Sequence, residues 1–277
     1  MKIISIDAGG TKSVGRLIHN GDTVHKIVLG FGNILMGDKA LKNIQEIIET
    51  LMVHDVEAIV IGMAGYNGYD NKAWLKCQLE GYCSKIYLMS DIELAYYHLV
   101  EDCGVLVLSG TGSVMLSRKK DFFIKAGGWG HLLGDEGSGY SIGLSGIRKM
   151  IEFDESHIDH PWIKEVLEFY GIDEVDDIKM LYSKPKSAIA KLSLMVSTSD
   201  YEFCKDIIKA EAEKLSKTLI RFMTVHELLP KTIALTGSVM NNQSYVKALS
   251  NRVKDYCDAE IMVDTSDHCL GGWHYIK

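Results

Sequence analysis

The sequence predicts an α/β fold in which one strand–turn–strand unit occurs twice. The chain has 277 residues, which suits two domains of roughly 100–150 residues each. Apolar, strand-like runs alternate with amphipathic, helix-like segments, as in α/β domains. The segment Gly10-Thr11-x-Ser13-Val14 recurs as Gly110-Thr111-x-Ser113-Val114, at a constant offset of 100 residues (111 minus 11). The repeat predicts a duplicated architecture with two loops facing a shared cleft.

In the first hundred residues, short apolar or alternating runs indicate strands, and a 3.6-residue periodicity indicates helices. The predicted strands span residues 2–6, 13–18, 24–29, 56–62 and 85–89. The predicted helices span residues 39–52, 71–79 and 91–100. The first of these helices carries Leu41, Ile44, Ile47, Ile48 and Leu51 on one face, which is the pattern of a helix packed on a core.

The same criteria apply to the rest of the chain. The predicted strands span residues 104–109, 114–118, 232–235 and 261–263, with a hairpin-like segment at 122–125. The predicted helices span residues 136–151, 160–170, 175–183, 186–198, 201–228 and 269–276, and one more follows residue 242 and ends near 256. Apolar residues recur with core periodicity in the helix at 201–228, which indicates packing rather than function.

Composition and charge exclude several classes of protein. Hydrophobic residues make up 47% and charged residues 24%, as in an ordinary soluble globular chain. The net charge of −7 leaves no basic stripe for nucleic-acid phosphates. No apolar run approaches the roughly 20 residues of a membrane span, and the first residues do not resemble a secretory signal. We therefore expect a cytoplasmic protein that binds neither nucleic acid nor membrane.

The cysteines give no sign of a metal site or a disulfide framework. Their positions are Cys77, Cys83, Cys103, Cys204, Cys257 and Cys269. No Cys-x-x-Cys pair occurs among them, so we expect reduced, mostly structural thiols.

The segment Gly127–Gly139 is the most unusual stretch of the chain. Six of its thirteen residues are glycine, which indicates a sharp turn or a ligand close to the backbone. Asp135 and Glu136 are expected to open the following helix, where acidic residues suit the positive helix end. A tight turn with an ordinary N-cap would explain the pattern, but Trp129 and His131 in the same run favour a binding shelf.

Two further stretches allow both a structural and a functional interpretation. Asp7–Ser13 is either a plain hairpin or a phosphate cradle, in which glycine N–H groups and the Thr11 hydroxyl face an anion. It leads into a strand, so it is not a Walker loop. Asp91 is either a first-turn acid beside a Ser90–Glu93 capping box or a general base at the carboxyl end of a strand. The turn at Gly237 and Ser238 is a plausible nucleotide contact.

Taken together, these motifs resemble a known family. Asp7–Ser13, Asp91 with Ala95, Ser109–Ser113, Gly127–Gly139 and Leu235–Asn242 occur in this order. They are similar to the eukaryotic-type N-acetylglucosamine kinases, within the BadF/BadG/BcrA/BcrD-type ATPase family of the actin and hexokinase superfamily. The most specific piece is Gly-Gly-Trp-Gly-His-x-x-Gly-Asp-Glu-Gly-Ser.

The resemblance implies two ribonuclease H-like domains with a central cleft. It divides the chain into residues 1–103 and 104–266, with a C-terminal helix at 267–277 that packs back on the first domain. The expected activity is ATP-dependent phosphorylation of the 6-hydroxyl of an amino sugar, N-acetylglucosamine first, with glucosamine and N-acetylmuramic acid as further candidates. The expected cofactors are ATP and Mg²⁺, and the expected assembly is a homodimer.

The resemblance also implies roles for individual residues. Contacts with ATP and its phosphates fall at Gly9, Gly10, Thr11, Lys12, Gly110, Thr111, Gly112, Gly237 and Ser238. Sugar contacts fall at Asn33, Gly65, Asp91, Gly128, Trp129, Asp135 and Gly139. Asp91 would be the catalytic base, and Asp7 would contact Mg²⁺ through water. The chain departs from the family pattern at Val114, where these kinases tend to carry a polar residue that helps to hold the sugar, and in the loop near Gly65.

Two alternatives come from other classes of protein. One is an ATP-hydrolysing activator that passes electrons to a partner enzyme through an iron–sulfur cluster. Cys103 precedes a nucleotide loop, but no matching second ligand is found. The other is a non-catalytic sugar sensor, which the intact Asp91 and phosphate loops disfavour.

Overall fold

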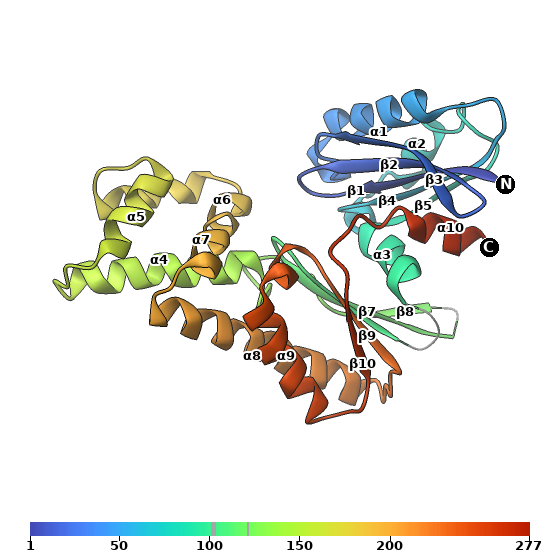
Figure 1. Ribbon diagram of the computed structural model, residues 1–277. Coiled ribbons are helices and arrows are strands. Elements are labelled where there is room, and N and C mark those ends of the chain that lie inside the picture. Colours follow the sequence, from blue (N-terminus) through green and yellow to red (C-terminus); the bar gives the residue numbers. More distant parts are fainter. Residues whose placement is uncertain (101–103, 121) are drawn as a thin grey trace. The chain divides into compact units, whose positions relative to one another are not determined.

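The computed structural model describes residues 1–100, 104–120 and 122–277, and the chain divides into two compact units (Figure 1). Unit 1 consists of Met1–Asp102 with Ser266–Lys277, and unit 2 of Cys103–Thr265. The predicted domain boundary after residue 103 and the side chain of Cys103 lie outside the described residues. Among the described residues, no helix combines the length and the apolar character that crossing a membrane requires.

Unit 1 contains a five-stranded sheet in the order β3-β2-β1-β4-β5. Its strands are β1 (Lys2–Ala8), β2 (Ser13–His19), β3 (Asp22–Leu29), β4 (Val56–Met63) and β5 (Ile86–Ser90). β1, β2 and β3 are joined antiparallel, whereas β1, β4 and β5 run parallel. Ala8 pairs with Met63, and Met63 pairs with Ser90, so three strands end at one edge of the sheet.

Helices cover both faces of this sheet (Figure 1). The elements are α1 (Asp38–Leu51), α2 (Lys72–Cys77), α3 (Asp91–Leu99) and α10 (Leu270–Ile276), with short 3₁₀ turns η1 (Ile34–Met36) and η2 (Tyr66–Gly68). The apolar stripe of α1 packs on one face, against Ile4 and Ile6. On the other face α10 lies against α3, and a side chain at Gly271 would overlap the Leu94 carbonyl. Because glycine has no side chain, α10 can approach α3 closely at Gly271.

Unit 2 repeats the strand order of unit 1 as β10-β9-β6-β7-β8. Its strands are β6 (Val105–Ser109), β7 (Ser113–Lys119), β8 (Phe122–Gly127), β9 (Thr232–Thr236) and β10 (Glu260–Val263). β6, β7 and β8 are antiparallel, and β6, β9 and β10 are parallel. Both Gly-Thr segments form antiparallel hairpin turns at equivalent places, which confirms the predicted duplication.

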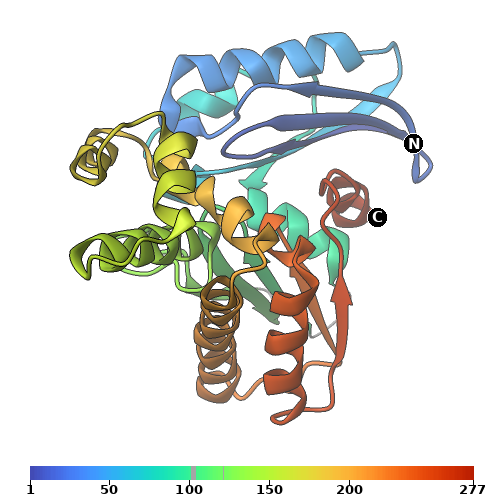
Figure 2. The ribbon, with the colours of Figure 1, turned by 60° about the vertical axis from the view of Figure 1, so that its left-hand side comes forward.

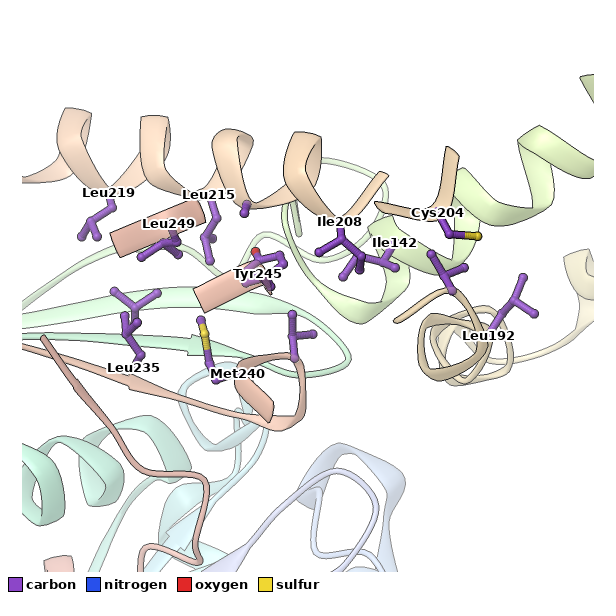
Figure 3. Packing of buried hydrophobic residues seen from close by; sticks show 14 of the residues in the cluster. Ile142, Leu192, Cys204, Ile208, Leu215, Leu219, Leu235, Met240, Tyr245 and Leu249 are labelled. Atoms are coloured by element: carbon purple, nitrogen blue, oxygen red, sulfur yellow. The ribbon is translucent and has the colours of Figure 1, made fainter. Parts of the chain in front are cut away.

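The helices of unit 2 are more numerous than those of unit 1. They are α4 (Gly139–Glu155), α5 (Pro161–Tyr170), α6 (Lys186–Ala190), α7 (Leu192–Thr198), α8 (Glu202–Val225) and α9 (Gln243–Lys254), with 3₁₀ segments η3 (Val175–Ser183) and η4 (Ser238–Asn241). α8 and α9 lie side by side, and α5, α6 and α7 contact α4 (Figure 2). The core between α8, α9 and the sheet includes Leu215, Leu219, Leu235, Tyr245 and Leu249 (Figure 3).

One predicted helix start was wrong. α4 begins at Gly139, and its N-cap is Ser138, whose hydroxyl accepts the Ser141 N–H at 3.3 Å. Asp135 and Glu136 precede the helix and do not open it. Asp135 has φ +66° and Gly137 has φ +71°, and a right-handed helix cannot contain these values. The segment predicted as one helix at 186–198 is likewise two short helices, α6 and α7.

Candidate active site

The first Gly-Thr turn, residues 9–12, joins β1 to β2 and leaves backbone donors free. The Gly9 N–H donates to the Lys12 carbonyl at 3.0 Å, and the Gly9 carbonyl accepts the Gly32 N–H at 2.9 Å. In the part of the chain that the structure describes, the N–H groups of Gly10 and Thr11 have no hydrogen-bond partner. Successive free N–H groups in a turn suit an anion.

The second Gly-Thr turn, residues 110–112, is one residue shorter, and its carbonyls are all occupied. Gly110 N–H donates to the Gly112 carbonyl, and the N–H groups of Gly139 and Tyr140 donate to the carbonyls of Gly110 and Thr111. Within the described residues the N–H groups of Thr111 and Gly112 have no partner. The turn therefore presents hydrogen-bond donors, which are the groups that bind the oxygens of a phosphate group.

Asp7 and Asp91 mark the carboxyl edge of the sheet in unit 1. Asp7 lies near the end of β1, and Asp91 follows β5 as the first residue of α3. The capping box of α3 is formed by Ser90 and Glu93, so capping does not occupy the Asp91 carboxylate. One Asp91 oxygen accepts the Ile92 N–H at 3.0 Å.

Both acids have raised pKa values, and Asp7 contributes to the shift of Asp91. Burial raises the pKa of Asp91 to about 6, and the negative charge of Asp7 adds to the effect. Burial also raises the pKa of Asp7, against the opposing influence of His268 and of the N–H bond that His268 donates. A carboxylate with a pKa near neutrality is poised to accept a proton.

The segment that returns from unit 2 to unit 1 holds Asp7 in place. The His268 N–H donates to Asp7 Oδ2 at 3.0 Å. The preceding Asp267 receives two hydrogen bonds from Arg16, at 2.8 and 2.6 Å, and one from Lys26 at 2.9 Å. Burial alone would raise the pKa of Asp267, but these cations outweigh it and hold the pKa well below its usual range. Arg16 and Asp267 are thus positioning residues that the sequence did not reveal.

The predicted sugar residues of unit 1 gather at the same sheet edge. The Asn33 side chain caps η1 by accepting the Leu35 N–H at 3.0 Å. The Ile34 N–H donates to the Ala64 carbonyl at 3.1 Å, which holds the two loops together. Gly65 adopts φ +79°, and a side chain there would meet the Asn33 amide. The structure therefore brings Asn33 and Gly65 to the edge that carries Asp7 and Asp91.

The glycine-rich shelf of unit 2, Gly127–Gly139, starts with two left-handed glycines. Gly127 and Gly128 have φ +76° and +70°, and Gly128 N–H donates to the Ser113 carbonyl at 2.9 Å. Val114 packs beside Gly128, where a Cβ would lie 3.2 Å from its Cγ2 atom. Trp129 is 68% exposed, and the Lys125 ammonium lies 5.9 Å from the centre of its indole ring.

Asp135 is the buried acid of the shelf. It is 2% exposed; its Oδ1 accepts the Ser113 N–H at 3.2 Å, and its Oδ2 pairs with Lys186 Nζ at 2.9 Å. A Cβ on Gly112 would lie 2.7 Å from Asp135 Oδ1, so the carboxylate borders the second Gly-Thr turn. Gly139 lies against the same turn, within reach of the Gly110 carbonyl.

Three buried groups fix the shelf at Gly137. Its carbonyl accepts hydrogen bonds from Ser109 Oγ at 2.8 Å and from the Tyr245 hydroxyl at 2.6 Å. Its N–H donates to Glu211 at 3.1 Å, and Glu211 also pairs with Lys214. Sequence periodicity missed Glu211 and Tyr245, because both lie on helices whose pattern predicts only a core.

The predicted nucleotide turn at Gly237 and Ser238 adjoins the second Gly-Thr turn. Gly237 has φ +99°, and a side chain there would overlap the Ser109 carbonyl. A Cβ on Gly110 would lie 3.8 Å from Ser238 Oγ. Gly110–Gly112, Gly237 and Ser238 therefore form one patch of at least partly exposed residues in unit 2.

Comparison with known proteins finds relatives that match most of the chain. A curated N-acetylmuramic acid/N-acetylglucosamine kinase of Clostridium acetobutylicum is 29% identical, over 88% of this chain and 87% of that protein. An N-acetyl-D-glucosamine kinase of Dictyostelium discoideum is 23% identical, over 97% of this chain and 95% of that protein.

Among solved structures, a candidate N-acetylglucosamine kinase from Chromobacterium violaceum has the same fold, with a TM-score of 0.81 at 20% identity, covering 100% of this chain and 99% of that one. The two repeated sheets and these neighbours identify the two-domain fold of actin and hexokinase-like ATPases. The model of the BadF/BadG/BcrA/BcrD ATPase family matches residues 4–266, and the chain belongs to that family.

Proposed function

We propose that this protein is a kinase that transfers the γ-phosphoryl group of ATP to the 6-hydroxyl of an amino sugar. N-acetylglucosamine is the first candidate, and glucosamine and N-acetylmuramic acid are the next. The names of the relatives support this class of substrate. The observation that carries the proposal is Asp91, a carboxylate with a pKa of about 6 at the sheet edge that also holds Asp7.

The nucleotide is assigned to backbone donors. The free N–H groups of the two Gly-Thr turns, with the Thr11 and Thr111 hydroxyls, bind phosphate oxygens, with Gly9, Lys12 and the other turn residues beside them. Gly237 and Ser238 flank the adenine nucleotide. Both turns have free N–H groups, and the carbonyls of the second turn are all occupied; this pattern fits a polyanion and supports the assignment.

Mg²⁺ is assigned to Asp7, through water. The donor set fits a hard cation, because the His268 N–H bonds only Oδ2 of the Asp7 carboxylate, and the charge of Asp7 is close enough to Asp91 to raise its pKa. When bound, the ion neutralises charge that develops on the phosphate oxygens. The contribution of this chain is to keep the Asp7 carboxylate oriented, through His268 and the Arg16–Asp267 pair.

Asp91 acts as the base. Its ionised carboxylate accepts the proton of the sugar hydroxyl as the bond to phosphorus forms, while the turns stabilise the charge on the transferring group. Catalysis of this kind depends mainly on position, so the rigid start of α3, with its complete capping box, supports the role.

The sugar is assigned to Asn33 and Gly65 of unit 1 and to Gly128, Trp129, Asp135 and Gly139 of unit 2. We propose that hydroxyls are held by the Asn33 amide, the Asp135 carboxylate and shelf backbone groups. Val114 makes the neighbouring wall apolar. We also propose a cytoplasmic homodimer of the eukaryotic-type branch, on the resemblance of the shelf motif.

The decisive experiment is a coupled ADP-release assay across a panel of amino sugars and plain hexoses. We expect ADP release that needs both an amino sugar and Mg²⁺, and a product phosphorylated at the 6-position. ADP release that is independent of every sugar would contradict the kinase and favour the activator alternative. Visible absorption after anaerobic purification would support that alternative in the same way.

A further inference from the structure

Lys186 belongs to a segment that unit 1 lacks. Between β3 and β4, unit 1 has α1 and η1, whereas unit 2 has the run from α4 to α8 between β8 and β9. α6 and α7 of this run lie against α4 (Figure 1, Figure 2). Close contact is possible because Gly143 and Gly146 face them; a side chain on Gly143 would overlap the Ile189 carbonyl. The packing brings the first residue of α6, Lys186, to the shelf.

At the shelf, Lys186 meets the acid that borders the second Gly-Thr turn. Its ammonium lies 2.9 Å from Asp135 Oδ2, and Asp135 Oδ1 holds the Ser113 N–H. The Asp135 side chain is 3% exposed and that of Lys186 is 34% exposed. Water therefore screens the carboxylate weakly, and the lysine is its only cationic partner among the described residues.

A buried negative charge beside this turn opposes a phosphate group. The N–H groups of Thr111 and Gly112 are free to bind an anion. The Asp135 carboxylate, however, lies against Gly112. A carboxylate beside a bound phosphate would repel it strongly where water is excluded. We propose that Lys186 is a positioning residue that neutralises Asp135 and thereby lets the turn at residues 110–112 accept nucleotide phosphate. This inference rests on the proposed use of ATP.

Calorimetric titration of the full chain, without sugar, tests the role of Lys186. Lys186→Met should weaken ATP binding about 10-fold or more and leave adenosine binding unchanged, because the repulsion acts only on phosphate. Lys186→Arg should keep ATP affinity within about threefold, since the charge stays. The double variant Asp135→Asn/Lys186→Met should recover ATP affinity to within about threefold of the wild type, because both charges are gone.

Lys179→Met is the matched control. It removes one positive charge from the same unit, where Lys179 pairs with the exposed Asp176. ATP affinity should then stay at the wild-type value. If Lys186→Met does not fold, Lys186→Gln gives the same comparison.

Three outcomes would overturn the inference: wild-type ATP affinity in Lys186→Met, equal losses for ATP and adenosine, or no recovery in the double variant. Failure of the proposed function looks different, because the wild-type chain itself would then show no ATP binding or no sugar phosphorylation.

Discussion

In unit 1 the first strand of the sheet ends in Asp7-Ala8, whereas the equivalent strand of unit 2 ends in Leu108-Ser109. The positions correspond because Asp7 pairs with Val14 and Leu108 pairs with Val114, directly beside the two Gly-Thr turns. Unit 1 also has an acid, Asp91, directly after its fifth strand. Unit 2 has instead the shelf, whose backbone is fixed by Ser109, Glu211 and Tyr245.

This difference shows how one sheet topology supports two chemical roles. In each unit the parallel strands supply the same sheet edge, and an antiparallel hairpin beside them supplies a turn with free N–H groups. Unit 1 adds two carboxylates whose pKa values are raised by burial, and the charge of Asp7 raises the pKa of Asp91 further. Unit 2 adds the glycine-rich shelf and a buried acid, Asp135, that is ion-paired with Lys186. The comparison predicts that charge-removing substitutions act on chemistry in unit 1 and on binding in unit 2.

The largest expected effect is on turnover, from Asp91→Asn in unit 1. The fall in kcat should be at least about 100-fold, because the amide cannot accept the hydroxyl proton. Sugar and ATP affinities should stay near the wild type, since the amide keeps the shape of the side chain. Steady-state kinetics and calorimetry on the same preparation check this. Near-normal turnover would remove Asp91 from its role.

The next largest effect is a loss of stability, which should be confined to a different unit in each of two variants. Gly271→Ala places a methyl group on the Leu94 carbonyl and should destabilise unit 1 by about 2–3 kcal/mol. Gly137→Ala puts Cβ 2.6 Å from Leu215 Cβ and at φ +71°, so unit 2 should suffer a similar loss. Hydrogen exchange, read segment by segment, should locate each loss in its own unit.

Gly81 provides the control for these two variants. No atom lies within 4 Å of a Cβ added there, so Gly81→Ala should change stability by no more than about 0.5 kcal/mol. Uniform loss of protection across both units in Gly271→Ala would show that the units do not unfold separately.

A smaller effect is expected on sugar binding, from Asp135→Ala in unit 2. Sugar affinity should fall about 10-fold or more, the usual cost of a lost charged hydrogen-bond partner. ATP affinity should change much less, because the variant also removes a negative charge beside the phosphate turn. Separate titrations with sugar and ATP measure the two losses. A larger loss for ATP would mean that the shelf has been misassigned.

The smallest expected effect is a pH-dependent gain in stability in Asp91→Asn. Since the folded-state pKa of Asp91 is raised to about 6, ionising it costs free energy that the unfolded chain does not pay. The asparagine variant should be more stable than the wild type at pH 7.5, where the wild-type carboxylate is ionised. The gain should shrink as pH falls from about 6 towards 4. Melting temperatures across this range test the sign.

Much of the fold could be predicted from local patterns. The β-branched run at Val56–Met63 and the stripe of α1 each encode their element within a few residues. The Ser90–Glu93 capping box was also predictable, because both partners lie within one turn. The start of α4 was not, since it depends on positive φ values at Asp135 and Gly137 that only the folded shelf imposes.

The supporting residues of the candidate site could not be predicted for a related reason. Arg16 and Asp267 are 251 positions apart, and nothing local distinguishes their charges from exposed ones. Glu211 is 1% exposed, yet it lies in a helix whose periodicity predicts an ordinary amphipathic face. In the sequence, nothing distinguishes Lys186 from other lysines at the start of a helix. Its position beside Asp135 depends on the packing of α6 against α4. Residues that are paired only by the tertiary structure have no characteristic separation in the sequence, so a search for motifs cannot find them.

The return of residues 266–277 to unit 1 has a consequence for biosynthesis. A ribosome completes the continuous unit 2 before it makes the segment that carries the His268 N–H and the helix α10. A nascent chain therefore holds the first sheet with one face covered by α3 without α10, and with Asp7 lacking its backbone donor. The earlier-translated unit is the later one to mature, because its acidic edge is completed only after residues 266–277 have been made.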